Sequence, residues 1–265
     1  MRLFALRLVL VAALVVPAAA AAQWNSPAPG QREANLRGES DQIFTLANQA
    51  RAQAGVGQLQ WDPALAAAAL QHCEQMATEG PIAHRYGGEP DLSARAAQAG
   101  ARFSVVEENV AVGPSAEAIH EEWMQSPGHR ANLLSPDVDH IGVAVVAARG
   151  VLYAVADYSQ AVQKLSAAQV EARVAALIRV SGVAILGDPS LARAACATDE
   201  GIPRSAGGAM PGFVIRWQDA DLSQLPKALV ARLASGRYRQ AGVGSCPAQD
   251  LEGSFTAYRV AVLLY

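Results

Sequence analysis

The sequence predicts an α+β protein, and two observations lead to that prediction. Alanine-rich segments with helical periodicity fill most of the first half, and two strand-like segments follow them, "IGVAVVA" at 141–147 and "VLYAVADYS" at 151–159. The Arg149-Gly150 pair between these segments is typical of a hairpin turn. The second half then runs through a similar order of helices and strands in a shorter form. Helices grouped ahead of strands, without strict alternation, indicate the α+β class.

The first expected helix begins at Ser40 or Asp41, since either side chain can cap it, and it ends at Gly55. Its apolar face comprises Ile43, Leu46, Ala47, Ala50 and Ala54. The preceding residues 23–39 are polar and include Pro and Gly, so we expect a flexible leader there.

Asp62-Pro63 predicts the start of a second helix, because proline lacks the N–H that the first helical position does not use. This helix is expected to stop at Gly80-Pro81 and to present one apolar side. That side comprises Ala66, Ala69, Leu70, Cys73 and Met76.

Three further segments complete the first half. Residues 91–100 predict a short helix that starts at an aspartate, and "SVVEENVAVG" at 104–113 predicts an extended or irregular segment. Pro114-Ser115 then opens another helix, with Ile119 and Trp123 about one turn apart on its inner side.

The two halves resemble each other at their starts and ends. "GVGQLQWDPALAAAA" at 55–69 aligns with "GVAILGDPSLARAA" at 182–195 with one deletion, and each half ends with a Gly-Val strand followed by a Tyr-containing strand. All five histidines lie in the first half. We therefore predict two modules, residues 40–162 and a degenerate copy at 163–265 that kept its core and lost its polar centre. The alternative is coincidence, since helix-start chemistry is generic.

The N-terminus predicts export. Arg2 and Arg7 precede an apolar run, Leu8–Val16, and small residues end near Ala22, which is the pattern of a signal peptide over residues 1–22. The run is too short to span a bilayer, and no later segment predicts a membrane helix. The mature protein is expected to begin after the cleavage site and to be secreted or periplasmic. The alternative is an uncleaved membrane anchor.

Charge and composition exclude one class of partner. The formal net charge is −3 and no basic block is present, so we expect no nucleic-acid binding. Hydrophobic residues make up 51% of the chain, which suits a globular protein with an adequate core.

The cysteines allow at most one disulfide bond within the chain. Export permits disulfides, and the chain has Cys73, Cys196 and Cys246. We prefer the pair Cys196–Cys246 because both residues lie in the C-terminal part. The alternative is three reduced cysteines that serve as small apolar side chains.

Two of the five histidines are candidates for chemistry. His84 and His129 are expected on loops, each beside an arginine, and loop residues on a rigid scaffold carry function more often than residues on helix faces. His72 and His120 fall within expected helices and are predicted to lie at the surface or its boundary. His140 precedes a strand, where it can cap or pack. A structural role for the loop histidines is the alternative.

Glu108 and Asn109 stand in an apolar stretch, "VEENVAV". A carboxylate close to two imidazoles can orient a ring by accepting its N–H, raise the pKa of that ring, and act as an acid or base. The alternative is that both side chains satisfy main-chain groups of a loop.

Three motifs together carry a family resemblance. "EENVAVG", "EEWMQSPGHRANLLSPDVDHIGVAV" and "YAVADYS" resemble the CAP superfamily of cysteine-rich secretory proteins, antigen 5 and pathogenesis-related 1 proteins, also called SCP domains. The match is closest to the bacterial extracellular branch and covers roughly residues 41–160. The resemblance implies a three-layer α-β-α sandwich with an open cleft. Two histidines and two glutamates line that cleft in the family, and the histidines can bind zinc or another divalent ion.

The resemblance also assigns the cleft positions. His84 in "AHRYG" and His129 in "SPGHR" take the two histidine places, and Glu108 in "EEN" takes the first glutamate place. Ser126 occupies the second glutamate place, so the chain departs from the family pattern and a role that needs two carboxylates is in doubt. Glu122, one helical turn earlier, is a weak substitute, and the alternative is that it is a solvated glutamate on the helix surface.

The bend at residues 126–128 is expected to end the tryptophan helix and turn His129 toward His84. Arg130 and Asn132 would hold this loop through main-chain hydrogen bonds. A metal held by His84 and His129 alone would bind weakly, since firm zinc sites have three or four protein ligands.

Three functions are compatible with these features. The preferred one is an exported binding or signalling module that is not an enzyme, with a cleft that holds a divalent ion such as zinc and a small molecule, lipid or peptide. The second is a metal-assisted hydrolase that activates water near Glu108. The missing second carboxylate and the lack of an HExxH motif count against it. The third is a structural envelope protein with a relic site.

Overall fold

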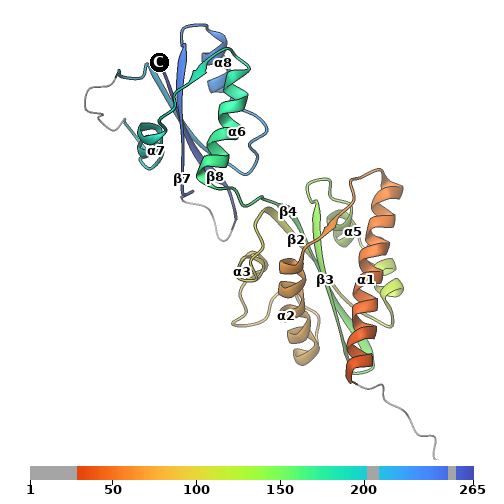
Figure 1. Cartoon of the computed structure of the whole chain (residues 1–265). Helices are drawn as coiled ribbons and strands as arrows, with labels where there is room; N and C mark the ends of the chain where they lie inside the picture. The colour runs from red at the N-terminus through yellow and green to blue at the C-terminus, as the bar shows by residue number, and fades with distance from the viewer. Residues whose placement is uncertain (1–28, 202–208, 250–254) are drawn as a thin grey trace, which may run out of the picture.

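The structure is a computed structural model that describes residues 29–201, 209–249 and 255–265 (Figure 1). The predicted signal peptide and the first residues of the predicted leader lie outside this part. The first module comprises α1 (Pro29–Ala54), β1 (Gln60–Trp61), α2 (Pro63–Glu79), α3 (Leu92–Gln98), β2 (Phe103–Gly113), α4 (Ala116–Gln125), α5 (Pro127–Leu133), β3 (His140–Ala148) and β4 (Val151–Ala161). No helix of the described ranges is both long enough and apolar enough to cross a membrane.

The sheet of the first module has the strand order β1-β3-β4-β2. The short β1 runs parallel to β3, and the other neighbours are antiparallel. Arg149 and Gly150, with φ of 52° and 79°, form the predicted turn between β3 and β4. Both residues adopt the left-handed conformation that two-residue hairpins favour.

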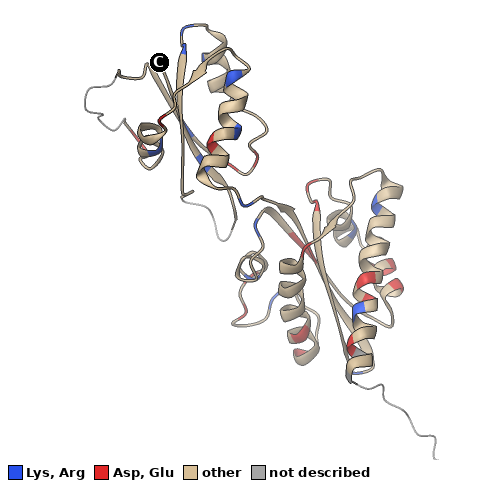
Figure 2. Cartoon of the chain, viewed as in Figure 1, with Lys and Arg blue, Asp and Glu red and all other residues tan. Residues whose placement is uncertain are grey.

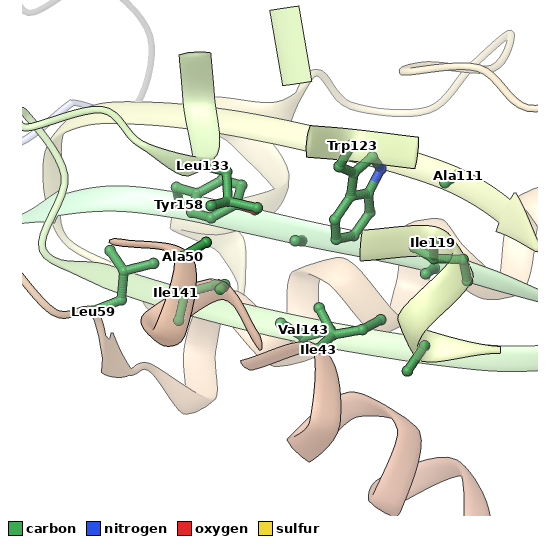
Figure 3. Packing of buried hydrophobic residues seen from close by; sticks show 14 of the residues in the cluster. Ile43, Ala50, Leu59, Ala111, Ile119, Trp123, Leu133, Ile141, Val143 and Tyr158 are labelled. Atoms are coloured by element: carbon green, nitrogen blue, oxygen red, sulfur yellow. The ribbon is translucent and has the colours of Figure 1, made fainter. Parts of the chain in front are cut away.

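Helices cover both faces of this sheet, so the module has three layers (Figure 1). On one face, α1 and α4 contribute Ile43 and Trp123 to a core that includes Val143 of β3 and Tyr158 of β4 (Figure 3). On the other face, α2 packs on β3 and β4 through Cys73 and its neighbours. The predicted α+β class is confirmed for this half.

The predicted starts of α2, α3 and α4 match the structure because each depends on local chemistry. Asp62 accepts hydrogen bonds from the first N–H groups of α2, and Asp91 and Ser115 do the same for α3 and α4. Gly80, with φ of 110°, ends α2 as expected.

The first helix is longer than predicted. α1 begins at Pro29, so residues 29–39 are helical and do not belong to a flexible leader. Ser40 does not cap the helix, because its hydroxyl lies inside it and donates to the carbonyl of Leu36. The extra turns are held by packing, since Leu36 contacts the core and Glu39 accepts a hydrogen bond from the first residue of α4. These contacts are tertiary, which is why local polarity was misleading.

The buried faces of α1 and α2 are slightly rotated from the predicted ones. Ala54 is exposed at the end of α1, and Leu70 of α2 is 43% exposed, with Ala66 half-buried. The residues of α2 that are buried are Leu65, Ala68, Ala69, His72, Cys73 and Met76. This stripe keeps helical spacing and faces β3 and β4.

The second module contains a smaller mixed sheet with helices. Its elements are α6 (Ala167–Arg179), β5 (Ala184–Ile185), α7 (Ser190–Cys196), β6 (Phe213–Asp219), α8 (Lys227–Ala234), β7 (Gln240–Cys246) and β8 (Tyr258–Leu264). The strand order is β5-β7-β8-β6, with β5 parallel to β7 and the other neighbours antiparallel. The disulfide Cys196–Cys246 joins α7 to β7, as preferred from the sequence, and Cys73 is free and buried.

Each module has one glycine on which a helix lies directly. A Cβ added to Gly142 of β3 would lie 2.0 Å from the main-chain nitrogen of Ala66 in α2. A Cβ added to Gly244 of β7 would lie 2.1 Å from the nitrogen of Arg193 in α7. Any larger residue at either position would force the helix away from the sheet.

Candidate functional site

The contact between His84 and Glu108 forms the centre of the candidate site. His84 lies on the loop between α2 and α3, and its Nδ1 is 2.8 Å from Oε1 of Glu108 in β2. The histidine side chain is 60% exposed, whereas that of Glu108 is 3% exposed. Hydrogen bonding to the Glu108 carboxylate raises the pKa of His84 above its ordinary value. The carboxylate also leaves Nε2 as the free ring nitrogen.

Arg95 of α3 holds the other oxygen of the Glu108 carboxylate. Its Nη2 donates to Oε2 of Glu108, and both side chains are almost fully buried. Nη1 of Arg95 lies 3.6 Å from Oε1 of Glu89. The guanidinium therefore balances two carboxylates, as a buried charge must be paired. Both oxygens of Glu108 are thus engaged within the protein.

His72 is part of this buried network, which corrects the prediction that it lies at the surface or its boundary. The residue is 0% exposed, and its Nδ1 is 2.7 Å from Oε1 of Glu89. Its Nε2 is 2.8 Å from the carbonyl oxygen of Ala83, so Nε2 carries a proton and donates it. Through Ala83, the ring fixes the main chain beside His84. The signal was present in the sequence, because His72 falls on the buried stripe of α2 at helical spacing.

Asp157 is a buried carboxyl group that the sequence did not single out. It is 0% exposed and lies directly opposite Glu108 in the pairing of β2 with β4. Among the described residues, neither of its carboxyl oxygens has a hydrogen-bond partner. Burial, together with the charge of Glu108, raises the pKa of Asp157 well above its usual range. A protonated Asp157 beside an ionised Glu108 is the arrangement this environment favours.

His129 lies in the first turn of α5, which begins where a bend was predicted. Its carbonyl oxygen accepts from Nδ2 of Asn109 at 2.9 Å. Asn132 donates to the carbonyl of Glu108 at 3.1 Å and to Oδ1 of Asn109 at 3.0 Å. These two amides tie α5 to β2 at the position of Glu108. Arg130 contributes through its main chain, which bonds to Ser126 and Leu134.

The ring of His129 has an unused nitrogen. In the described part of the chain its Nδ1 is buried and has no hydrogen-bond partner. Burial lowers the pKa of His129, and the nearby charge of His84 lowers it further. The neutral imidazole that results is the form that binds metals.

The other predicted site residues contribute less. Ser126 joins α4 to α5, and its side chain makes no capping hydrogen bond to α5. Glu122 is exposed, and its charge opposes the lowering of the His129 pKa. His120 is half-buried, and Nδ1 of His140 contacts its neighbour Asp139 at 2.7 Å. Among the described residues, no group of three or more His, Cys, Asp or Glu side chains is arranged to hold a metal.

The sequence matches the family model "Cysteine-rich secretory protein family" over residues 44–158. A protein of Bacillus subtilis named "Uncharacterized membrane protein YlbC" is 35% identical over 111 residues, which cover 39% of this chain and 30% of that protein. "Uncharacterized protein YkwD" of the same organism is 32% identical over 108 residues, 39% of this chain and 41% of that protein. The chain therefore spans less than half the length of either relative.

Several solved structures are similar to part of this chain. An extracellular SCP-domain protein of Bacillus anthracis is 25% identical, with a TM-score of 0.48 over 51% of this chain and 44% of that one. NaASP2, crystallised with Zn2+, is 12% identical, with a TM-score of 0.35 over 46% of this chain and 79% of that one. The family match covers the helices and strands that place His84, Glu108 and His129. The chain thus carries a CAP (SCP) domain of the cysteine-rich secretory protein family over residues 44–158.

Proposed function

We propose that this chain is an exported binding module, in which His84, Glu108 and His129 face one water-filled cleft beside β2. The observation that carries the proposal is the fixed geometry of Glu108. Its carboxylate is buried and pinned by Arg95, yet it contacts an imidazole that is 60% exposed. A buried network that ends in an exposed, oriented ring is typical of a site that receives a ligand.

Binding is favoured over hydrolysis because no carboxylate is free to move protons. Oε1 of Glu108 is engaged by His84 and Oε2 by Arg95, and the side chain is only 3% exposed, so water has little access to this carboxylate as a proton donor. The second glutamate place of the family is held by Ser126. Asp157 is 0% exposed and lies beside Glu108 on the neighbouring strand, so a solvent-borne substrate cannot reach it.

The two imidazoles fit a weakly held divalent ion such as zinc. Nε2 of His84 and the ring of His129 make no hydrogen bond to another described residue, and Nδ1 of His129 is buried, which leaves Nε2 of each ring for a ligand. Glu108 would orient His84 as carboxylates orient zinc-bound histidines. Two protein ligands leave positions for water or for a ligand atom, and a small molecule, lipid or peptide is the class of ligand that such a cleft admits.

We further propose that the second module is a degenerate copy of the first. The strand orders and directions of the two sheets correspond, and in both modules an Asp-Pro pair follows the short parallel strand. Asp62 follows Trp61 directly, whereas Leu186 and Gly187 separate Ile185 from Asp188.

The position at which α7 contacts β7, compared with that of α2 on β3, also supports the proposal that the second module is a copy of the first. By strand register Gly142 corresponds to Gly242, yet α7 rests on Gly244, two positions farther along β7. The two residues Leu186 and Gly187, which the first module lacks between its short strand and its Asp-Pro pair, explain this displacement. They move the start of the helix to the next position on the same face of the strand. The copy has no histidine, which fits a module that serves interaction or support.

Metal binding by the purified mature protein tests the proposed site. Titration with zinc is compared between the unaltered protein, a His84→Ala/His129→Ala variant and a His140→Ala control. Uptake that is saturable, lost in the double variant and kept in the control supports the site. Equal uptake by all three proteins would remove it. Hydrolysis that requires both histidines and Glu108 would instead favour the hydrolase.

A further inference from the structure

A groove lies between α1 and α2, along the edge of β3, and it is separate from the site at His84. Its volume is about 720 Å3. The floor is the strand segment Val143–Val146, and the walls are α1 and the start of α2. Two large apolar residues that line it are exposed to solvent: Trp61 is 37% exposed and Leu70 is 43% exposed.

The groove follows a strand edge that has no partner strand in the described ranges. β1 has only two residues and pairs with His140 and Ile141, so the rest of β3 continues past its end. The carbonyl of Ile141 accepts a hydrogen bond from Asp62 on the β1 side. Because main-chain groups alternate sides along a strand, Val143 and Val145 present their N–H and C=O groups at the same edge.

An unpaired edge with apolar side chains invites another strand. Val143 and Val145 face α1, whereas Ala144 packs with the cluster under α2. A strand laid beside β3 would therefore place alternate side chains toward α1 and toward α2. Ala66 and Ala67 are small and leave room on the α2 wall.

The charges at the groove indicate the character of the added strand. Glu33 and Asp41 of α1 and Glu74 of α2 line it, against a single basic residue, Arg37. Acidic residues occur on both helices that flank β3 (Figure 2). A partner with lysine or arginine beside its apolar residues would complement this surface.

We propose that this groove binds an extended peptide segment of another protein, with alternating apolar residues and flanking basic ones, by adding it as a strand to the edge of β3. Main-chain hydrogen bonds to Val143 and Val145 supply affinity, and the two helical walls supply selectivity. A second copy of this chain paired edge to edge is the competing occupant.

The test uses the full mature chain and a synthetic peptide, acetyl-Lys-Thr-Val-Thr-Val-Lys-amide, beside the same peptide methylated on its four internal main-chain nitrogens. NMR spectra follow the amides of β3 during titration. We expect saturable binding of the unmethylated peptide only, with the amides of Val143 and Val145 gaining protection from hydrogen exchange. Methylation removes the donors and blocks approach, so it separates strand addition from simple apolar contact.

Matched variants keep the result interpretable. Ala67→Arg fills the groove from α2, and Ala52→Arg introduces the same exposed side chain on α1 outside it. Binding should weaken at least tenfold in the first variant and stay unchanged in the second. Equal binding of both peptides, or no binding of either at millimolar concentration, would overturn the proposal. Self-association abolished by Ala67→Arg, without peptide binding, would assign the edge to a second copy.

Discussion

Glu108 and Asp157 are directly opposite each other across the pairing of β2 with β4, and both are buried. Glu108 is held by Arg95, and burial together with the charge of Glu108 raises the pKa of Asp157 well above its usual range. The pair forms the inner end of a polar path that runs outward through Glu108 to the exposed ring of His84. The stability of the domain and the geometry of its site therefore depend on the same few groups.

Replacing Glu108 should destabilise the domain. Glu108→Gln leaves Arg95 with a weakened partner in a buried position, and breaking a buried ion pair costs about 3 kcal/mol or more. Urea unfolding of the variant should show this loss in the free energy of unfolding. Glu107→Gln is the matched control, since its side chain is half-buried and burial already raises the pKa of Glu107. A similar loss in both variants would contradict the special role of the pair.

Asp157 should make stability depend on pH. Its pKa is raised in the folded protein, so the folded state binds the extra proton more tightly than the unfolded state. Stability should therefore fall as pH rises from about 4, the ordinary value, toward the folded pKa, and then level off. Asp157→Asn mimics the neutral acid and should lack this slope. Urea unfolding of both proteins between pH 4 and 8 measures it, and parallel curves would show that Asp157 does not titrate in this way.

The ring of His84 should titrate above the ordinary histidine value in metal-free protein, because it donates to a carboxylate. NMR titration of the ring protons after treatment with EDTA measures its pKa. Glu108→Gln should lower that pKa toward 6.5, the value of an unperturbed histidine. The stabilisation from this contact is present below the unfolded pKa and is lost as pH rises through the folded pKa. An identical pKa in the variant would mean that the contact does not persist in solution.

The disulfide should stabilise the second module alone. Cys196 and Cys246 are 50 positions apart, and closing a loop of that length stabilises by about 4 kcal/mol in the chain-entropy description. Cys196→Ser/Cys246→Ser should lower the unfolding temperature of the second module and leave that of the first unchanged. Calorimetry of the variant beside the unaltered protein measures this change. Cys73→Ala, which alters only the first module, should lower the unfolding temperature of the first module and leave that of the second unchanged.

Local signals in the sequence predicted helix starts well and tertiary pairings poorly. Asp62 and Ser115 were identified because a cap needs only its own helix. The place of Asp157 beside Glu108 depends on the register of two strands that are distant in the chain. The sequence signal for Asp157 is a lone acidic residue in the apolar stretch "YAVADYS".

The candidate site shows the same division. The family motifs pointed to His84 and Glu108, and the structure brings these two residues together. The support that Arg95 and Glu89 give could not be predicted, because it requires α3 and the loop before it to fold against β2.

We propose that His84 and His129 share one site beside Glu108. A zinc-edge anomalous difference map from crystals of the mature protein, soaked with zinc, tests it most directly. We predict one peak about 2.0–2.1 Å from both Nε2 of His84 and Nε2 of His129, absent from His84→Ala crystals. Zinc bound only elsewhere, or imidazoles that point away from each other in the same map, would contradict the claim.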